Sequence, residues 1–458
     1  MKQQFISHTS QPRLLLIFAG WGMDAAPFAG LQRDGYDIAV VWDYTSDHFD
    51  TSGYKTYRET VILAWSMGVW GASRVIPSSG LPVTLTIAIN GTTTPVSDTT
   101  GIPTDIFNST LNGLNPASLL KFYRRTAGGA AAYKDFASHI PQRDIDELRT
   151  ELIRIAEAGA PADDMRWDKA IISTNDAIFP PDNQHRHWDN VCETIAIEGP
   201  HLPAWNEILE HFIIDKSLVQ SRFSRSSSTY DKEATMQQRI ASHLWALWQT
   251  HMNEAIKPEH IIEIGYGTGT FTQLYAKKLS PVTLQLWDLV PPQSATGLPG
   301  EKICCDAETS IMNQPDASVD AIVSTSAIQW FNSISAFLRQ SLRVLRPGGV
   351  LVASTFGSHT FRELTQAGMP TLPYMSINSI RAIIPDGFET IDIHEGIITK
   401  MFDSPMDVLR HMKATGVNAL RRNASPTLTR TLITQYPLSN DNRASLTYNP
   451  IYLILKKL

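Results

Sequence analysis

The stretch HIIEIGYGTGTF, residues 260–271, decides the fold of the C-terminal half of the chain. Its apolar run Ile261–Ile264 is rich in β-branched residues and leads directly into Gly265, Gly267 and Gly269. This pattern predicts a buried strand, a tight turn and the start of a helix. Glycine is required where the backbone turns sharply or lies against a ligand, because it has no Cβ atom. The free N–H groups at such a helix N-terminus can bind polar ligand atoms.

The spacing of these glycines separates two kinds of cofactor-binding turn. The dinucleotide-binding fingerprint is GxGxxG, whereas Thr270 stands where its last glycine would be, so the spacing here is GxGxG. This spacing favours the strand, turn and helix of methyltransferases that use S-adenosylmethionine. A glycine turn with a purely structural role is the alternative for so short a motif.

Acidic residues after the next two strands strengthen the first interpretation. Asp288 ends the apolar run Leu284–Trp287, about twenty residues past the first glycine, where a carboxylate can accept from both ribose hydroxyls. Asp306 follows a third strand-like segment and can accept from an adenine amino group. Each acid alone could instead cap a helix. The combination predicts S-adenosylmethionine as the cofactor, bound by Glu263, Gly265, Gly267, Gly269, Asp288, Asp306 and Ala307.

The chain is long enough for more than this domain. Its 458 residues suit two or three domains. Methyltransferase domains of this kind begin only a few tens of residues before their glycine turn, so the roughly two hundred residues upstream predict a second domain. The formal net charge of −6 argues against a general nucleic-acid-binding protein.

The cysteine content and the hydropathy exclude further classes. Three cysteines cannot form a disulfide framework, which favours a reducing cytoplasm, and no Cys or His spacing typical of a metal site occurs. The first residues, MKQQFISHTSQPR, lack the apolar core of a signal peptide, and no apolar run is long enough to span a bilayer. We therefore expect a cytoplasmic protein without a metal ion and without a membrane partner.

The N-terminal half contains the pattern of a nucleophile elbow. The apolar run Val61–Trp65 is followed by Ser66-Met67-Gly68 and then by the helical segment Val69–Val75. A strand, a serine, a glycine and a helix in this order lift the serine hydroxyl above the sheet. The usual pattern is GxSxG, and here Ala64 replaces the first glycine. Ser66 is the predicted nucleophile, with a structural serine as the alternative.

A serine nucleophile needs a base and an orienting acid, and in this kind of fold the chain order is serine, acid, histidine. Asp176 lies just beyond the predicted strand Lys169–Ser173, and His201 lies just beyond the predicted strand Glu193–Glu198. These positions predict Asp176 as the acid and His201 as the base, although Asp176 could also cap the next helix. The rivals of the same residue types are Asp182, His185 and His187.

Two further features complete the predicted hydrolase site. Trp21 in the early loop and Met67 after the nucleophile would donate backbone N–H groups to an oxyanion. The segment 103–162 is polar and helical and looks like a cap inserted over the pocket. Its apolar residues Leu119, Leu120 and Phe122 are the predicted walls of an acyl pocket.

The N-terminal half resembles the small α/β-hydrolases that cleave pimeloyl-acyl-carrier-protein methyl ester, the BioG type. The resemblance rests on FAGWGMD, AWSMG, TNDAIFPPDNQ and EGPH. It implies an α/β-hydrolase domain at residues 1–215, with a helical cap at about 103–162, that acts as a Ser-His-Asp esterase.

The C-terminal half resembles the malonyl-acyl-carrier-protein O-methyltransferases, the BioC type. The resemblance rests on FSRSSSTYDKEATMQ, EIGYGTGTFT, CDAE, SAIQWF, LRPGGVL, STFGSHTFREL and HMKATGVN. It implies a Rossmann-like, seven-stranded class I methyltransferase domain at residues 217–458, in which Tyr230 and Gln329 are candidates for orienting the substrate. The segment RSSSTYD departs from the alanine-rich form expected of the family, and this serine cluster is either a linker or a lid over a ligand.

The two resemblances imply one bifunctional enzyme of biotin-precursor synthesis, whose partner is an acyl-carrier protein. The methyltransferase would cap the malonyl carboxylate, on carrier protein or on coenzyme A, and the esterase would later uncap the pimeloyl product. Two alternatives stay open: a general carboxylesterase fused to a small-molecule methyltransferase, and an inactive hydrolase scaffold that docks the carrier. Because carrier proteins are acidic, basic residues are the docking candidates. They are Lys121, Arg124, Arg125, Arg143, Arg149, Arg154, Arg410, Lys413, Arg421 and Arg422.

Overall fold

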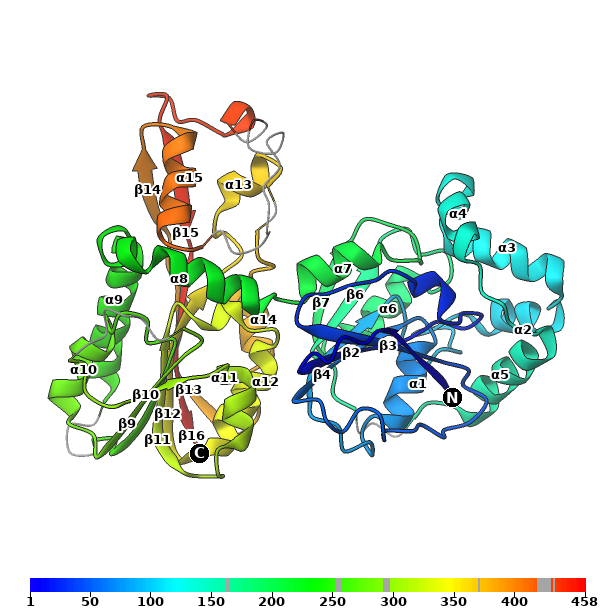
Figure 1. The fold of residues 1–458 in the computed structure, drawn as a ribbon, viewed down its shortest axis with the longest axis horizontal. Helices are drawn as coiled ribbons and strands as arrows, with labels where there is room; N and C mark the ends of the chain where they lie inside the picture. Colours follow the sequence, from blue (N-terminus) through cyan, green and yellow to red (C-terminus); the bar gives the residue numbers. More distant parts are fainter. Residues whose placement is uncertain (162–164, 253–256, 291–296, 370, 418–429, 431–432) are drawn as a thin grey trace. The chain divides into compact units, whose positions relative to one another are not determined.

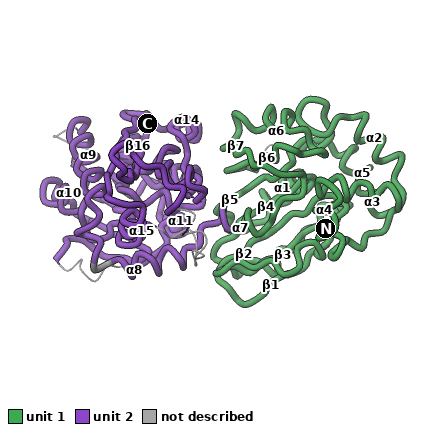
Figure 2. Tube along the Cα trace, turned by 90° about the horizontal axis from the view of Figure 1, so that it is seen from above, with its two compact units in different colours: residues 1–209 green, residues 210–458 purple. Residues whose placement is uncertain are grey.

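The computed structural model describes residues 1–161, 165–252, 257–290, 297–369, 371–417, 430 and 433–458. The chain divides into two compact units, residues 1–209 and 210–458, which Figure 2 shows in different colours. The division falls within helix α7, Trp205–Phe212, a few residues before the joint at Asp215 that the sequence suggested.

Unit 1 contains a seven-stranded sheet in the order β1-β3-β2-β4-β5-β6-β7. β1 pairs antiparallel with β3, and every other neighbouring pair in this sheet is parallel. The central strands are continuous apolar runs, as expected for a parallel sheet covered on both faces. The strands are β1 Lys2–Ser7, β2 Arg13–Phe18, β3 Tyr36–Trp42, β4 Glu59–Trp65, β5 Val83–Ile89, β6 Lys169–Ser173 and β7 Glu193–Ile197.

The helices of unit 1 either follow strands or belong to the segment predicted as a cap. α1 begins directly after β4 and packs on β4 and β2. Helices α2 to α5 gather at one end of the unit (Figure 1), and we call residues 103–161 the cap. Asn115 caps α3 through a capping box, and Asp144 caps α5. The helices are η1 Ala26–Phe28, α1 Gly68–Val75, α2 Thr104–Asn112, α3 Pro116–Thr126, α4 Ala130–Phe136, η2 Ala137–His139, α5 Ile145–Ala158, α6 Pro181–Trp188 and α7.

Unit 2 contains a second seven-stranded sheet, in the order β10-β9-β8-β11-β12-β16-β13. The neighbouring strands β10, β9, β8, β11 and β12 pair in parallel, in that order. β16 lies between β12 and β13 and is antiparallel to both. This is the Rossmann-like fold of class I methyltransferases, as the sequence predicted for this half. The strands are β8 His260–Ile264, β9 Thr283–Asp288, β10 Glu301–Cys304, β11 Val319–Thr325, β12 Leu345–Phe356, β13 Phe388–Glu395 and β16 Pro450–Lys457, with β14 Ile398–Phe402 and β15 Ala444–Tyr448 in a separate antiparallel pair.

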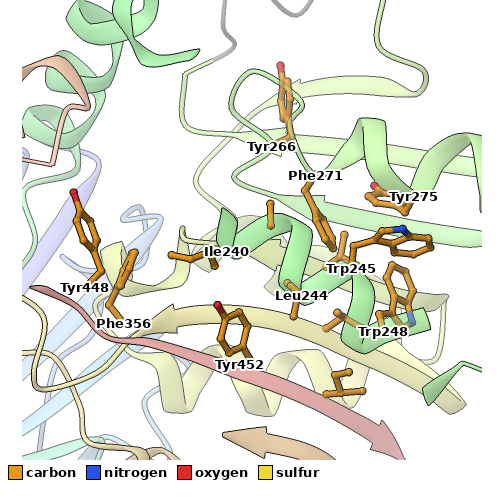
Figure 3. Packing of buried hydrophobic residues seen from close by; sticks show 14 of the residues in the cluster. Ile240, Leu244, Trp245, Trp248, Tyr266, Phe271, Tyr275, Phe356, Tyr448 and Tyr452 are labelled. Carbon is orange, nitrogen blue, oxygen red and sulfur yellow. The ribbon is translucent and has the colours of Figure 1, made fainter. Parts of the chain in front are cut away.

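Helices cover both faces of this sheet, with α9 and α10 on one face and α11, α12 and α14 on the other (Figure 1). Figure 3 shows part of the first core, where Ile240, Leu244 and Trp248 of α9 pack near Phe271 and Tyr275. The helices are α8 Lys216–Glu233, α9 Thr235–His251, α10 Thr272–Leu279, α11 Ala307–Ser310, η3 Ile311–Asn313, η4 Ile328–Trp330, α12 Ile334–Val344, α13 Arg362–Gln366, α14 Ile377–Ala382 and α15 Pro405–Ala414.

The serine cluster at residues 222–231 lies within the helix α8, so its interpretation as a linker is wrong. Asp215 caps this helix by accepting a hydrogen bond from the Leu218 N–H group. α8 packs on α15, where Thr229 Oγ1 donates to the Ala414 carbonyl oxygen at 2.9 Å. Tertiary packing therefore outweighs the modest helix propensity of serine.

Three general features of the described residues bear on function. No helix among them is long and apolar enough to cross a membrane. No group of three or more His, Cys, Asp or Glu side chains within the described ranges could hold a metal ion. Cys192, Cys304 and Cys305 are free thiols.

Candidate functional site

The three residues predicted as a catalytic triad form a hydrogen-bonded chain in unit 1. His201 Nε2 is 2.9 Å from Ser66 Oγ, and His201 Nδ1 is 2.9 Å from both carboxylate oxygens of Asp176. All three side chains are buried, with His201 only 1% exposed. This arrangement can serve as a nucleophile, a base and an orienting acid that are shielded from bulk water.

Ser66 stands at a sharp turn between β4 and α1. Its backbone is left-handed, with φ of 59°, a conformation that non-glycine residues rarely adopt. Two glycines leave room for the turn, because a Cβ atom at Gly68 would lie 2.2 Å from the Phe18 carbonyl oxygen and one at Gly91 would lie 2.2 Å from that of Ser66. Ala64, where the usual motif has its first glycine, is fully buried in β4 and is accommodated.

Contacts from separate segments fix the acid and the base. Asp176 Oδ1 accepts the N–H groups of Ile178 and Phe179 at 2.8 and 2.9 Å, in addition to facing His201. The Phe179 ring stacks on His201 with centroids 6.0 Å apart. Asn90 Nδ2 donates to the His201 carbonyl oxygen at 2.8 Å. The contacts of Asp176 are therefore compatible with both interpretations: the carboxylate can orient His201 and can also cap the following turn.

The rival residues bond elsewhere. Asp182 is exposed in the first turn of α6. His185 Nδ1 is 3.0 Å from Asp189 Oδ1, and His187 Nε2 is 3.1 Å from Thr93 Oγ1. In the described part of the chain, none of the three rivals is hydrogen-bonded to the Ser66 hydroxyl, whose partner is His201.

Trp21 and Met67 line a small cavity of about 20 Å³ together with Ser66, and we call it the inner cavity. Among the described residues, neither backbone N–H group donates to a protein acceptor. Two such N–H groups beside a nucleophile can stabilise the negative charge of a tetrahedral intermediate. The structure thus brings together all five residues predicted for the hydrolase site.

The inner cavity shares lining residues with a larger space of about 480 Å³, the outer groove. Ile106, Phe122 and Arg125 of the cap line both. Leu119 lines the outer groove only. Leu120 is 42% exposed and lines neither space, so its prediction as a pocket wall is wrong.

A separate cavity in unit 2 lies at the carboxyl ends of β8, β9 and β11. Of the residues predicted to bind the cofactor, Gly265, Gly267, Asp288, Asp306 and Ala307 line it. The remaining two, Glu263 and Gly269, are not among its lining residues.

Helix α8 supplies one wall of this cavity, as a lid over a ligand would. Tyr230, a candidate for orienting the substrate, is among the lining residues, together with Phe223 of the same helix. Burial raises the pKa of the Tyr230 phenol, so this group is a neutral hydrogen-bond donor. Gln329, the other candidate, does not line the cavity, and its Nε2 donates to the Ser326 carbonyl oxygen.

The Asp288 carboxylate lies beside the glycine turn. Its Oδ2 accepts the Gly267 N–H at 2.9 Å, and its Oδ1 accepts the Val290 N–H at 2.8 Å. Burial raises the pKa of Asp288 to about 6, against the opposing effect of the backbone hydrogen bonds. At neutral pH the group is therefore a partly buried anion whose oxygens can accept further hydrogen bonds.

Glu263 supports the core rather than the cavity lining. Its Oε2 accepts hydrogen bonds from Thr272 Oγ1 at 2.7 Å and Tyr275 OH at 2.6 Å, both from α10. Burial raises the pKa of Glu263 to about 7. These bonds tie β8 to the helix that follows the glycine turn.

Sequence reasoning missed Lys216, which lines the cavity from the first turn of α8. Its Nζ is 2.6 Å from Glu308 Oε2 and 3.7 Å from Asp306 Oδ1, and it donates to the Trp330 carbonyl oxygen at 2.9 Å. No local pattern points to this lysine, because its partners lie far along the chain. It connects the lid helix to the acid at the end of β10.

The chemistry of this cavity fits S-adenosylmethionine. Asp288 and Asp306 stand at the ends of neighbouring strands and offer carboxylates for ribose hydroxyls and an adenine amino group. The turn passes close to the opposite loop, because a Cβ atom at Gly265 would lie 2.3 Å from the Ala327 Cβ. Apolar side chains, including Leu289 and Trp330, supply the walls that a purine ring requires.

The basic docking candidates are divided by their surroundings. Lys121, Arg124 and Arg125 of the cap are exposed. Arg143 is wrong as a docking candidate, because its side chain is only 3% exposed and pairs with the buried Glu151. Arg149 donates to the Leu111 and Leu114 carbonyl oxygens, and Arg154 pairs with Asp47. In unit 2, Arg410 and Lys413 are exposed. The last two candidates, Arg421 and Arg422, lie outside the described residues.

Comparison with known proteins finds a family description that matches each half of the chain. The family description "Pimeloyl-ACP methyl esterase BioG" matches residues 1–212, and the description "Methyltransferase domain" matches residues 262–353. A Bacteroides fragilis protein named malonyl-acyl-carrier-protein O-methyltransferase is 36% identical over 458 residues, which cover 97% of this chain and 92% of that protein.

Two matches from Haemophilus influenzae concern the N-terminal half. An uncharacterized protein of that organism is 35% identical over 223 residues, which cover 46% of this chain and 100% of that protein. A crystal structure of BioG from the same organism is 35% identical, covers 44% of this chain and 94% of that chain, and has a TM-score of 0.41.

Proposed function

We propose that this chain, which belongs to the malonyl-acyl-carrier-protein O-methyltransferase family, makes and cleaves methyl esters of acyl groups held by an acyl-carrier protein. Unit 2 is a methyltransferase with S-adenosylmethionine as its cofactor. Its acceptor in this proposal is the free carboxylate of malonyl-acyl-carrier protein. Unit 1 is then an α/β-hydrolase that cleaves pimeloyl-acyl-carrier-protein methyl ester.

Methyl transfer to a carboxylate requires alignment more than proton transfer. S-adenosylmethionine supplies an electrophilic methyl group, and a malonyl carboxylate is already ionised at neutral pH and needs no general base. In the proposed site Asp288 and Asp306 hold the cofactor, and Tyr230 orients the acceptor with a neutral hydroxyl. Phe223 and Trp330 exclude water, which leaves the carboxylate less solvated and more nucleophilic.

The observation that carries the esterase proposal is the hydrogen-bonded chain from Ser66 through His201 to Asp176. Ser66 Oγ would attack the ester carbonyl while His201 accepts its proton. His201 would then give this proton to the methoxide oxygen as its bond to the carbonyl carbon breaks, so that methanol leaves, and water would cleave the acyl-enzyme by the same route. Asp176 holds the imidazole in the required tautomer, and the N–H groups of Trp21 and Met67 receive the oxyanion.

The direct test is mass spectrometry of loaded carrier proteins incubated with the purified full chain. Malonyl-carrier protein with S-adenosylmethionine should gain one methyl group, and pimeloyl-methyl-ester carrier protein should lose one. Ser66→Ala should abolish the second reaction and retain the first, whereas Asp288→Ala should weaken the first and spare the second. His201→Ala should behave like Ser66→Ala because triad members act as a unit.

The outcomes also separate the alternatives. Hydrolysis of short free methyl esters without any preference for carrier-bound ester would indicate a general carboxylesterase. Absence of hydrolysis by the wild type on every ester, with methylation intact, would indicate an inactive scaffold that docks the carrier. Methylation of free malonate but not of malonyl-carrier protein would reject the proposed acceptor.

A further inference from the structure

Four consecutive residues of the loop after β2 are hydrogen-bonded to the cap. This loop carries Trp21, which lines the inner cavity and whose backbone N–H would receive the oxyanion in the proposed esterase. The bonds come from three elements that lie more than a hundred residues further along the chain. They are Trp21 Nε1 to the Leu148 carbonyl oxygen at 3.0 Å, Tyr123 OH to the Gly22 carbonyl oxygen at 2.7 Å, Arg143 Nη1 to the Met23 carbonyl oxygen at 2.9 Å, and the Gln142 N–H to Asp24 Oδ2 at 2.7 Å.

Two of these donors are themselves held rigidly. The Tyr123 side chain is buried at 1% exposure within α3, and its ring would be 3.4 Å from a Cβ atom at Gly22. Arg143 Nη2 donates to the buried Glu151 Oε2 at 3.0 Å, and Glu151 Oε1 accepts the Tyr44 N–H at 3.1 Å. Both donors therefore have little freedom to follow the loop if it moves.

The bonded carbonyl groups determine where the loop points its N–H groups. Peptide units are planar, so fixing the carbonyl oxygens of Gly22 and Met23 fixes the planes of two peptide units. The first of these units carries the Met23 N–H, which donates to the Gly20 carbonyl oxygen at 3.2 Å, and this oxygen belongs to the peptide unit that carries the Trp21 N–H. The loop has no helix or strand of its own between β2 and η1 to hold this geometry.

We propose that Tyr123 and Arg143 are positioning residues that hold the oxyanion-binding N–H of Trp21, so that ester cleavage requires a closed cap. This inference rests on the proposed esterase function of unit 1. Stabilisation of an oxyanion depends on donors placed before the charge develops. A cap that opens would release the loop, and the triad would then face a carbonyl group without its full complement of donors.

The phenol of Tyr123 offers the cleanest test, because Tyr123→Phe removes one donor and keeps the ring. Removal of an oxyanion donor lowers kcat about 10²–10³-fold, so misplacement of one donor should lower it by roughly 10–100-fold. The KM for a small p-nitrophenyl ester should stay within about twofold, because ground-state contacts are retained. The matched control is Tyr133→Phe on α4, because the Arg124 guanidinium lies over its ring and its hydroxyl makes no hydrogen bond to the loop within the described residues.

The decisive readout is the affinity for a tetrahedral inhibitor, such as a boronic acid, measured well below the unfolding temperature. Reaction with a fluorophosphonate counts the folded sites in each preparation. In Tyr123→Phe, inhibitor affinity should fall in proportion to kcat, whereas Tyr133→Phe should match the wild type. A lower Tm with unchanged kcat would overturn the inference, as would a lower kcat with unchanged inhibitor affinity or an equal loss in Tyr133→Phe. A wild type that neither hydrolyses the ester nor reacts with the fluorophosphonate would contradict the esterase function, and this inference with it.

Discussion

The indole Nε1 of Trp65 donates a hydrogen bond of 2.9 Å to the carbonyl oxygen of His201. Trp65 is the last residue of β4 and directly precedes the proposed nucleophile, Ser66. The strand that presents the serine therefore also holds the loop that presents the base. Their rings lie close as well, with centroids 5.5 Å apart.

Trp65→Phe should lower kcat of ester hydrolysis by about fivefold, the effect of losing one neutral hydrogen bond of roughly 1 kcal/mol. The loss is moderate because Asn90 Nδ2 still donates to the same carbonyl oxygen. The measurement is steady-state kinetics with a soluble methyl ester. Trp70→Phe is the matched control, because its Nε1 donates to the Gly159 carbonyl oxygen instead. Equal losses in both variants would point to general destabilisation.

The affinity for S-adenosylmethionine should fall as the pH falls through about 6, because burial raises the pKa of Asp288 to about 6. The ionised carboxylate accepts hydrogen bonds from ribose hydroxyls, whereas the protonated form loses part of this capacity. Binding should therefore be strongest above pH 7 and weaken below pH 6. Calorimetric titrations across this range measure the effect. In Asp288→Asn the affinity should be lower and nearly independent of pH, and a pH profile like that of the wild type would reject the assignment.

The esterase should prefer long acyl chains. A buried methylene contributes about 0.8 kcal/mol, so the four extra methylenes of pimeloyl over malonyl ester could favour it by roughly 3 kcal/mol, on the order of a hundredfold in kcat/KM. Phe122 lines both the inner cavity and the outer groove, so Phe122→Ala should flatten this preference. The test is a chain-length series with methylation silenced by Asp288→Ala.

Leu120→Ala is the control for the chain-length series, because Leu120 belongs to the same helix but is 42% exposed. It should retain the steep dependence. A flat profile in the wild type would mean that the short ester is protected by some other means, such as rapid consumption by elongation enzymes.

Glu263 should make the folded protein less stable as the pH rises. Its folded pKa of about 7 lies above the ordinary value of 4.5, so the folded state binds the proton more tightly. The stability from this group is fully present below pH 4.5 and is lost as the pH rises through about 7. Urea denaturation at pH 5 and pH 8 should show a smaller decline in Glu263→Gln than in the wild type. Glu259→Gln, an exposed neighbour just before β8, should decline like the wild type.

The buried strands of both sheets were predictable, and the peripheral elements were not. Continuous apolar runs such as Leu14–Phe18 and Val61–Trp65 specify strands that parallel sheets bury on both faces. β1 reads KQQFIS, exposes Lys2 and Gln4, and becomes a strand only by pairing with β3. β14 and β15 pair with each other across a long stretch of sequence, and short strands of this kind carry no distinct local signal.

The order of the site residues was predictable, but their environments required the structure. Chain order, together with a position just beyond a predicted strand, selected Asp176 and His201 over their rivals. Glu263 does not line the cavity, whereas its neighbour Ile264 does. Successive side chains of a strand point to opposite faces of the sheet, so the two residues face different surroundings. Lys216 had no signal at all, since its pairing with Glu308 joins segments far apart in sequence.

The left-handed turn at Ser66 would place the proposed esterase activity in opposition to stability. A side chain at φ of 59° costs on the order of 1 kcal/mol relative to glycine, which adopts this conformation freely. Ser66→Gly should therefore be more stable than Ser66→Ala by about that amount in thermal denaturation, and both should be inactive as esterases. A protein selected only for stability would favour glycine at this position. A serine that keeps its backbone strain while it lines the inner cavity is what selection for hydrolysis would leave. A hydrolase half retained merely to dock a carrier would gain nothing from this strain.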